Sequence, residues 1–199
     1  MIYFPVTSCD SKKNDSPKEM SFKPQVSVDS SVTISQDSSM KKITELLNIG
    51  NIMAKTEGVE IRIWYNDLSL IGKLVVIKND HGWQSSGYDY TAKVNDNFDV
   101  ISLEKRLTSN EPSSGWTSFL KAITDLGMYK LKNYKHIPGY FLCTDGETVG
   151  IEIRKDNYYQ SYFYPCFMLY QDSLKEVKRV KNICLFIQKE FGYQLLPGN

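Results

Sequence analysis

The alternation of apolar and polar positions predicts a strand-rich domain. Residues 60–65 alternate as a half-buried strand does, and residues 74–77 form a more continuous apolar run. Similar runs predict further strands at 83–93, 98–103, 140–143, 149–154 and 158–164. Turn residues such as Asp145-Gly146 and Asp156-Asn157 separate several of these runs, so we expect antiparallel hairpins.

Three segments place apolar residues at helical spacing. The first runs from Ser38 or Ser39 to about residue 55, the second follows Ser113 or Ser114 and stops at Gly127, and the third opens on a capping box, Ser173 with Glu176, and stops at Gly192. Together these patterns predict an α+β fold with an antiparallel sheet of about five to seven strands, packed by about three helices that cover one face.

The chain divides into three parts by composition. Residues 1–9 are mostly apolar, and residues 10–39 are rich in Ser, Asp, Lys and Pro, with only isolated apolar positions. Such a segment buries too little surface to offset its ordering entropy, so we expect a flexible tether; the alternation at 26–34 leaves a short edge strand as an alternative. Residues 40–199 are expected to form a single α+β domain.

Composition and charge exclude several classes of function. The formal net charge is only +1, so the chain lacks the positive field that draws nucleic acid, and no nucleic-acid partner is expected. No run of about 18 apolar residues occurs, so any membrane attachment is expected at a terminus.

The apolar start changes to a polar sequence at a cysteine. Val6-Thr7-Ser8-Cys9 resembles the lipobox of bacterial lipoproteins. That resemblance implies that residues 1–9 are a truncated lipoprotein signal with its lipobox. Cys9 then becomes the mature N-terminus and carries acyl chains, so that a membrane is a partner through this anchor. The whole chain resembles small envelope lipoproteins of Bacteroidota-type bacteria, which implies a place in the cell envelope, at the outer membrane or the periplasmic face. A cytoplasmic location is the alternative if Cys9 is not lipidated.

No recognised catalytic or metal-binding motif occurs in the sequence. Cys143, Cys166 and Cys184 lie among apolar residues and read as buried small side chains; in an exported protein two of them could pair, but the spacing does not select which. Residues 95–99 carry carboxamides and carboxylates but lack an EF-hand pattern, so we expect a solvated turn. We therefore predict no cofactor, no metal site and no catalytic residue.

Aromatic side chains crowd the last predicted strand. A strand with one buried face needs large apolar groups only at alternate positions, whereas here rings occupy both faces. Exposed rings favour contacts with proteins or sugars, and the alternative is a strand covered on both faces. The candidate binding surface comprises Tyr158, Tyr159, Tyr162, Phe163, Tyr164 and Tyr170.

Three functions compete at this stage. The leading hypothesis is a non-catalytic, lipid-anchored envelope protein that binds a protein partner, for example as an immunity protein or inhibitor. The first alternative is an envelope lipoprotein that binds glycan through the same rings. The second is a hydrolase of an envelope polymer or lipid, for which His81, His136, Asp145 and Glu147 are the available side chains.

Overall fold

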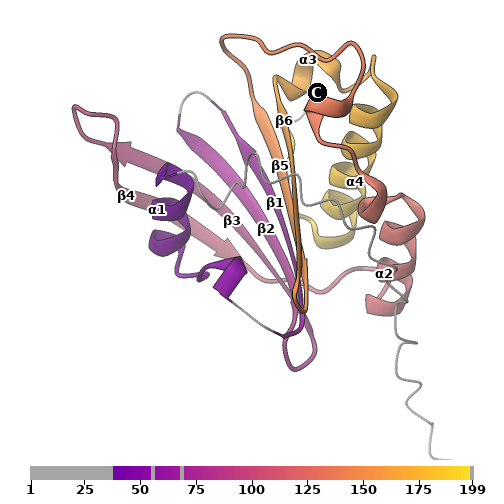
Figure 1. The fold of residues 1–199 in the computed structure, drawn as a ribbon. Coiled ribbons are helices and arrows are strands. Elements are labelled where there is room, and N and C mark those ends of the chain that lie inside the picture. The colour runs from indigo at the N-terminus through magenta and orange to yellow at the C-terminus, as the bar shows by residue number, and fades with distance from the viewer. Residues whose placement is uncertain (1–37, 55–56, 68–69, 198–199) are drawn as a thin grey trace, which may run out of the picture.

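The computed structural model describes residues 38–54, 57–67 and 70–197 (Figure 1). They form one antiparallel sheet with strand order β4-β3-β2-β1-β5-β6, which confirms the predicted α+β class. The strands are β1 (Val59–Asn66), β2 (Ile71–Asn79), β3 (Trp83–Val94), β4 (Val100–Thr108), β5 (Thr148–Lys155) and β6 (Tyr158–Pro165). The helices are α1 (Ser38–Leu47), α2 (Trp116–Asp125), α3 (Phe167–Tyr170) and α4 (Lys175–Phe191), with short 3₁₀ turns η2 (Ile52–Ala54), η3 (Met128–Lys130) and η4 (Tyr134–His136).

Strand β1 is bordered by two strands that come from different parts of the chain. Strands β1 to β4 form a meander, and β5 returns after α2 to pair with the free side of β1. The register places Ile61 between Ile77 and Ile153, and Ile63 between Val75 and Ile151. These aligned β-branched side chains form a continuous apolar surface across the three middle strands.

Helices α2 and α4 cover this apolar surface (Figure 1). Phe119 of α2 packs its ring against Phe191 of α4, with ring centroids 4.9 Å apart. The buried positions of α4 recur at helical spacing and face the sheet; they are Val177, Val180, Ile183, Cys184, Ile187, Glu190 and Phe191. This layer is the main core of the domain.

Helix α1 lies on the opposite face of the sheet, so the expectation that helices cover one face was wrong. It packs against β4 and closes a second apolar cluster that includes Trp64, Leu74 and Tyr90. Strands β1 and β2 are buried on both faces, and the apolar part of the second face requires a cover of its own. Helix α1 also ends at Leu47 rather than near residue 55, because Asn48 (φ 60°) and Gly50 (φ 72°) adopt left-handed backbone conformations.

Residues 140–143 do not form the predicted strand. They belong to the irregular loop 137–147 between η4 and β5, which contains Pro138 and a left-handed Gly139. The disulfide of Cys143 and a hydrogen bond from the Tyr140 hydroxyl attach the loop to other elements, in place of the hydrogen bonds between strands. The Asp145-Gly146 pair is accordingly part of this loop and does not form a hairpin.

The predicted serine caps are also absent from the two later helices. The residue before α2 is Gly115, and the residue before α4 is Leu174; neither provides a side-chain cap. The Glu190 carboxylate accepts hydrogen bonds at the start of α2 instead, from the Ser113 hydroxyl (3.1 Å) and the Ser114 amide (2.9 Å). A residue distant in sequence thus ties the start of α2 to the end of α4. The glycine stops are confirmed, because Gly127 and Gly192 are left-handed.

Gly72 should be essential for the packing of Tyr90. A Cβ at Gly72 would lie 2.1 Å from Cζ of Tyr90, whose ring crosses the glycine and whose hydroxyl donates to Oδ1 of Asn66 (2.5 Å). We predict that Gly72→Ala lowers the free energy of unfolding by about 1–3 kcal/mol through overpacking, measured by urea denaturation. In a Tyr90→Ala background the methyl group has room, so the cost should largely vanish; an equal cost in both backgrounds would contradict this packing.

Candidate functional site

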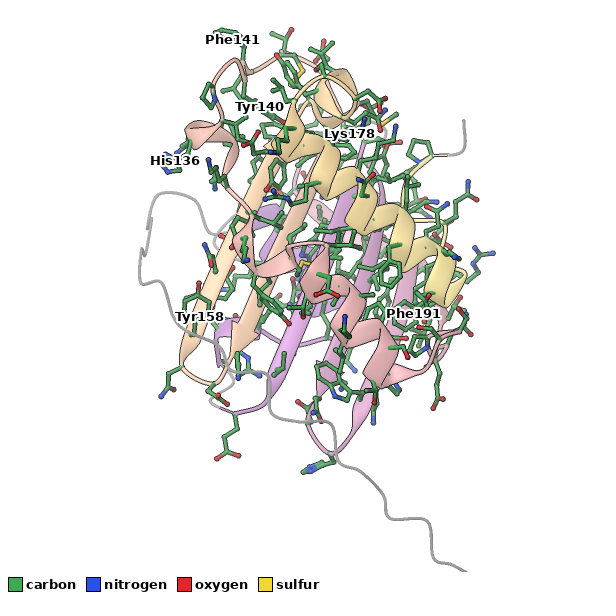
Figure 2. The ribbon with its side chains drawn as sticks, turned by 90° about the vertical axis from the view of Figure 1, so that its right-hand side faces the viewer. His136, Tyr140, Phe141, Tyr158, Lys178 and Phe191 are labelled. Carbon is green, nitrogen blue, oxygen red and sulfur yellow. A yellow bond between two sulfur atoms is a disulfide. The ribbon has the colours of Figure 1, made fainter. Side chains whose placement is uncertain are left out.

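One end of the molecule carries a loop that is exposed and yet held at several points. We call it the tip and define it as the loop 137–147 together with Cys166 and helix α3. It extends from the end of the sheet where β5 begins and β6 ends. Figure 2 shows Phe141 at the outer end of the tip, with Tyr140 beneath it.

Covalent and hydrogen bonds fix the tip. A disulfide joins Cys143 to Cys166 across 23 residues of sequence, which resolves the open question of which cysteines pair; Cys184 is free and buried. In the chain-entropy account, a crosslink of this span stabilises the folded state by about 3 kcal/mol. The amide of Cys143 also donates to Sγ of Cys166 (2.9 Å), so the backbone of the loop lies directly on the bridge.

Two tyrosines anchor the loop on either side of the disulfide. The Tyr140 hydroxyl donates to the carbonyl of Pro165 (2.5 Å), and its ring packs on that of Tyr170 with centroids 4.5 Å apart. The Tyr170 hydroxyl donates to the Phe141 carbonyl (3.0 Å) and accepts from the Phe141 amide (3.3 Å). The backbone at Phe141 is therefore fixed, although its side chain extends into solvent.

The tip presents three large apolar side chains to solvent, next to the exposed polar residues Thr144 and Asp145. Phe141 is 72% exposed, Leu142 64% and Leu169 65%. Single exposed apolar residues are common, but three within one braced tip, two on the loop and one on α3, are a candidate for a protein contact, and we call them the apolar patch. Because the backbone is already ordered, docking of a partner on this patch costs little conformational entropy.

The aromatic strand differs from the predicted binding surface. Tyr162 and Tyr164 are buried in the main core against the helices, so these two rings are inaccessible to a partner. Tyr158, Tyr159 and Phe163 are half-buried. Tyr170 is also half-buried, and it braces the tip rather than continuing a row of exposed rings. The two buried rings lie on one face of β6, where the core of a sheet requires large side chains, and Tyr159 and Phe163 on the other face are only half-buried.

The side chains nominated for hydrolysis are not brought together. His81 lies exposed in the turn between β2 and β3, at the end of the sheet opposite to the tip, whereas His136 is exposed on η4. Asp145 and Glu147 lie in the tip, at the start of β5. General acid–base catalysis needs such groups within hydrogen-bonding reach of one substrate, which this arrangement does not provide for His81.

The other expectations concern metals and membranes. Residues 95–99 form a turn in which Oδ1 of Asn95 accepts from the amides of Asn97 (3.0 Å) and Asp99 (2.9 Å), as predicted for a solvated turn.

Within the described ranges, no group of three or more His, Cys, Asp or Glu residues could hold a metal ion. No helix in these ranges has the length and apolarity to cross a membrane. Cys9, the lipobox and the expected tether at 10–39, apart from its last two residues, lie outside the described residues.

A cluster of buried charges, which the sequence reasoning missed, lies on the sheet face that α1 partly covers. Glu60 and Arg62 of β1 face Arg154 and Glu152 of β5, so that opposite charges alternate across the two strands. All four are at most 2% exposed. Glu60 and Arg62 form an ion pair with an N–O distance of 2.6 Å. A buried ion pair of this kind is costly to break, because the remaining charge is left uncompensated.

The arginines of this cluster attach the chain segment that follows α1 to the sheet. Nη2 of Arg62 donates to the carbonyls of Ile49 (3.2 Å) and Gly50 (2.9 Å). Nη2 of Arg154 donates to the carbonyl of Glu57 (2.6 Å). These bonds satisfy backbone groups outside the strands, so we assign the two guanidinium groups a structural role.

Glu152 of this cluster is buried and has a shifted pKa. Burial raises the pKa of its carboxyl group above the ordinary value. The indole of Trp64 donates to Oε2 (2.8 Å) and the hydroxyl of Tyr159 donates to Oε1 (2.6 Å), and both bonds lower the pKa by a smaller amount. The carboxylate is thus satisfied by neutral donors and has no route to a substrate in this arrangement.

Glu152 should make the stability of the domain depend on pH. Its folded-state pKa lies above its unfolded value, so the folded state binds the proton more tightly, and this contribution to stability is lost as the pH rises from 4.5 through the raised pKa. We predict that Glu152→Gln removes this loss in urea unfolding followed across that pH range. Glu104→Gln is the control, because the pKa of this exposed carboxyl is lowered by Lys93. Identical pH profiles for Glu152→Gln and the wild type would contradict the assignment.

Comparisons with known proteins do not assign the chain to a family. A scan against protein-family models, a search of curated proteins and a search of solved structures each found no match. What the chain binds must therefore be inferred from its own residues.

Proposed function

We propose that this protein is a non-catalytic binding protein of the cell envelope, anchored through a lipidated Cys9, and that its tip docks on a protein partner. The observation that carries the proposal is the exposed apolar surface of Phe141, Leu142 and Leu169 on a loop closed by a disulfide. An immunity protein or inhibitor is one form that such a protein takes.

The disulfide supports an extracytoplasmic location. Disulfides form and persist in oxidising compartments such as the bacterial periplasm and the cell surface, and they are rare where thiols are kept reduced. The Cys143–Cys166 bond closes the loop that carries the apolar patch, so its loss would affect the patch directly. The bond is consistent with the export that the Val6-Thr7-Ser8-Cys9 sequence implies.

The chemistry of the tip favours a protein over a glycan. Sugar binding uses rings whose faces are open, together with polar groups that bind hydroxyls. At the tip the rings of Tyr140 and Tyr170 pack on each other, and the large hydrophobic side chains that are exposed there are one phenylalanine and two leucines. Such side chains bury well against an apolar pocket of a partner protein.

Variants of the tip test the proposed docking surface. We predict that Phe141→Ser/Leu142→Ser/Leu169→Ser abolishes co-purification of a partner from the host's envelope fraction, since truncation of a central apolar side chain in an interface costs about 1 kcal/mol or more. The matched control is Phe98→Ser/Ile101→Ser/Leu107→Ser, which removes three comparably exposed apolar side chains from the β3–β4 hairpin. Equal recovery of the same partner by both triple variants would contradict docking through the tip.

The anchor is tested separately on protein isolated from its native host. We expect mass spectrometry to find acyl chains on Cys9 at the mature N-terminus, because two chains are enough for stable membrane attachment. Cys9→Ser should release the protein from the membrane fraction while the tip still binds its partner. An unmodified Cys9 in the membrane-bound protein would exclude the lipid anchor and leave the docking proposal standing.

A further inference from the structure

A polar cavity lies on the face of the sheet that α2 and α4 cover, beyond the end of α4. Its volume is about 230 Å³, and its walls come from β2, β3, β4 and residues 192–195. Phe191, labelled in Figure 2, marks the end of α4, from which the chain continues along the cavity. Strand β1 separates these three strands from β5 and β6, which adjoin the tip, so the cavity is a different site from the proposed docking surface.

Gly87 provides the space for the cavity. Its neighbours on β3, Ser86 and Tyr88, direct their side chains to the opposite face, as alternation along a strand requires. The ring of Tyr193 occupies the position above Gly87, where an added Cβ would lie 2.7 Å from Cδ1 of that ring. The cavity therefore has a backbone floor at Gly87 and an aromatic wall at Tyr193.

The Tyr193 ring is held rigidly in that wall. Its hydroxyl donates to the Thr108 carbonyl (3.1 Å) and accepts from the Asn110 amide (2.9 Å), and its ring stacks on Phe191 with centroids 5.7 Å apart. These bonds tie the wall to the start of the segment that links β4 to α2. The cavity is preformed, which is typical of small-molecule sites.

Three charged side chains from neighbouring strands line the cavity, with Lys73 the most shielded and Arg106 the most exposed of them. Lys73 pairs in register with Asp89, and Asp89 pairs with Arg106, so the three lie side by side on β2, β3 and β4. Two cations and one carboxylate leave an excess positive charge. The three charges thus favour an anion in the cavity.

The carboxylate of Asp89 forms hydrogen bonds with Arg106 and only a long contact with Lys73. Oδ2 of Asp89 accepts from Nη2 (2.5 Å) and Nε (3.1 Å) of Arg106, whereas Oδ1 lies 4.0 Å from Nζ of Lys73. The ammonium group of Lys73 donates instead to the carbonyl oxygen of Gln194, a neutral acceptor. Lys73 is therefore a largely shielded cation, with its side chain 23% exposed, whose contact with a carboxylate is weak.

We propose that this cavity binds a carboxylate group, which accepts hydrogen bonds from the Lys73 ammonium and from the N–H groups of Arg106 that Asp89 does not use. Arg106 has five N–H donors, and two of its nitrogens already contact Asp89. The Tyr193 ring then packs against the apolar part of the ligand. The carboxylate belongs either to a free small acid or to an acidic side chain of a polypeptide.

Titration of the full-length protein with succinate, followed by amide NMR, tests this site. We expect saturable shifts at the amides of Gly87 and Gln194, which line the cavity. Lys73→Gln should weaken the affinity about tenfold or more, because it removes a charge-assisted hydrogen bond. Asp89→Asn should strengthen binding, because it removes the carboxylate that competes for the same cations.

A matched control separates the site from general attraction of anions. Lys93 lies on the same strand as Asp89 and pairs with Glu104 (2.7 Å) outside the cavity, so Lys93→Gln should leave the succinate affinity unchanged. An absence of saturable shifts with every probe, equal losses in Lys73→Gln and Lys93→Gln, or weaker binding by Asp89→Asn would overturn the proposal.

The source of the carboxylate is decided by a second probe. A short blocked peptide containing one glutamate is titrated in parallel, and its glutamine counterpart serves as the control. Saturation by succinate alone supports a free acid as the ligand, whereas saturation by the glutamate peptide alone supports a polypeptide side chain. The tip variant Phe141→Ser/Leu142→Ser/Leu169→Ser should bind these probes normally, so failure of the docking proposal and failure of this one are distinguishable.

Discussion

The register of β1 between β2 and β5 is the constraint on which the rest of the fold depends. It aligns Ile61 and Ile63 with β-branched partners on both neighbouring strands, and it thereby sets which face α2 and α4 must cover. A shift of one residue would move every one of these side chains to the other face. The same register places Arg62 opposite Glu152 on the second face, where a shift would separate the charges.

The two faces of the sheet consequently serve different purposes. One is an apolar layer whose burial supplies most of the favourable free energy of folding. The other combines the apolar cluster beneath α1 with four buried charges, whose guanidinium groups fix the segment after α1. Because both faces are occupied at β1, the candidate surfaces for partners lie away from this strand: the tip beyond β5 and β6, and the cavity lined by β2, β3 and β4.

Sequence patterns predicted the class of the fold well because they reflect local periodicity. The α4 segment shows this, since its apolar spacing and Gly192 define its buried face and its end. The same reasoning failed where long-range contacts decide the outcome. Residues 140–143 have the composition of a strand, but the disulfide to Cys166 and the Tyr170 hydroxyl hold them in a loop.

The buried charges and the cavity could not be predicted from the sequence for a related reason. The alternation over residues 60–65 predicts a half-buried strand, whereas Glu60 and Arg62 are buried as well, and the matching pair on β5 compensates their charges. Likewise, nothing local indicates that Tyr193 lies over Gly87 or that Lys73 lies beside Asp89. The aromatic run of β6 is evident in the sequence, but rings occupy successive positions, so the pattern does not identify which of them are buried in the core.

Site-specific photo-crosslinking in the native envelope tests the central claim, docking through the tip, most directly. A photoreactive side chain replaces Phe141 in one variant and Phe98 in another, because both positions are highly exposed and lie on different loops. The account predicts a discrete crosslinked protein from position 141 that is absent from position 98 and disappears when the Cys143–Cys166 bond is removed. Crosslinking to the same protein from position 98 alone, or no crosslinked protein from position 141, would contradict it.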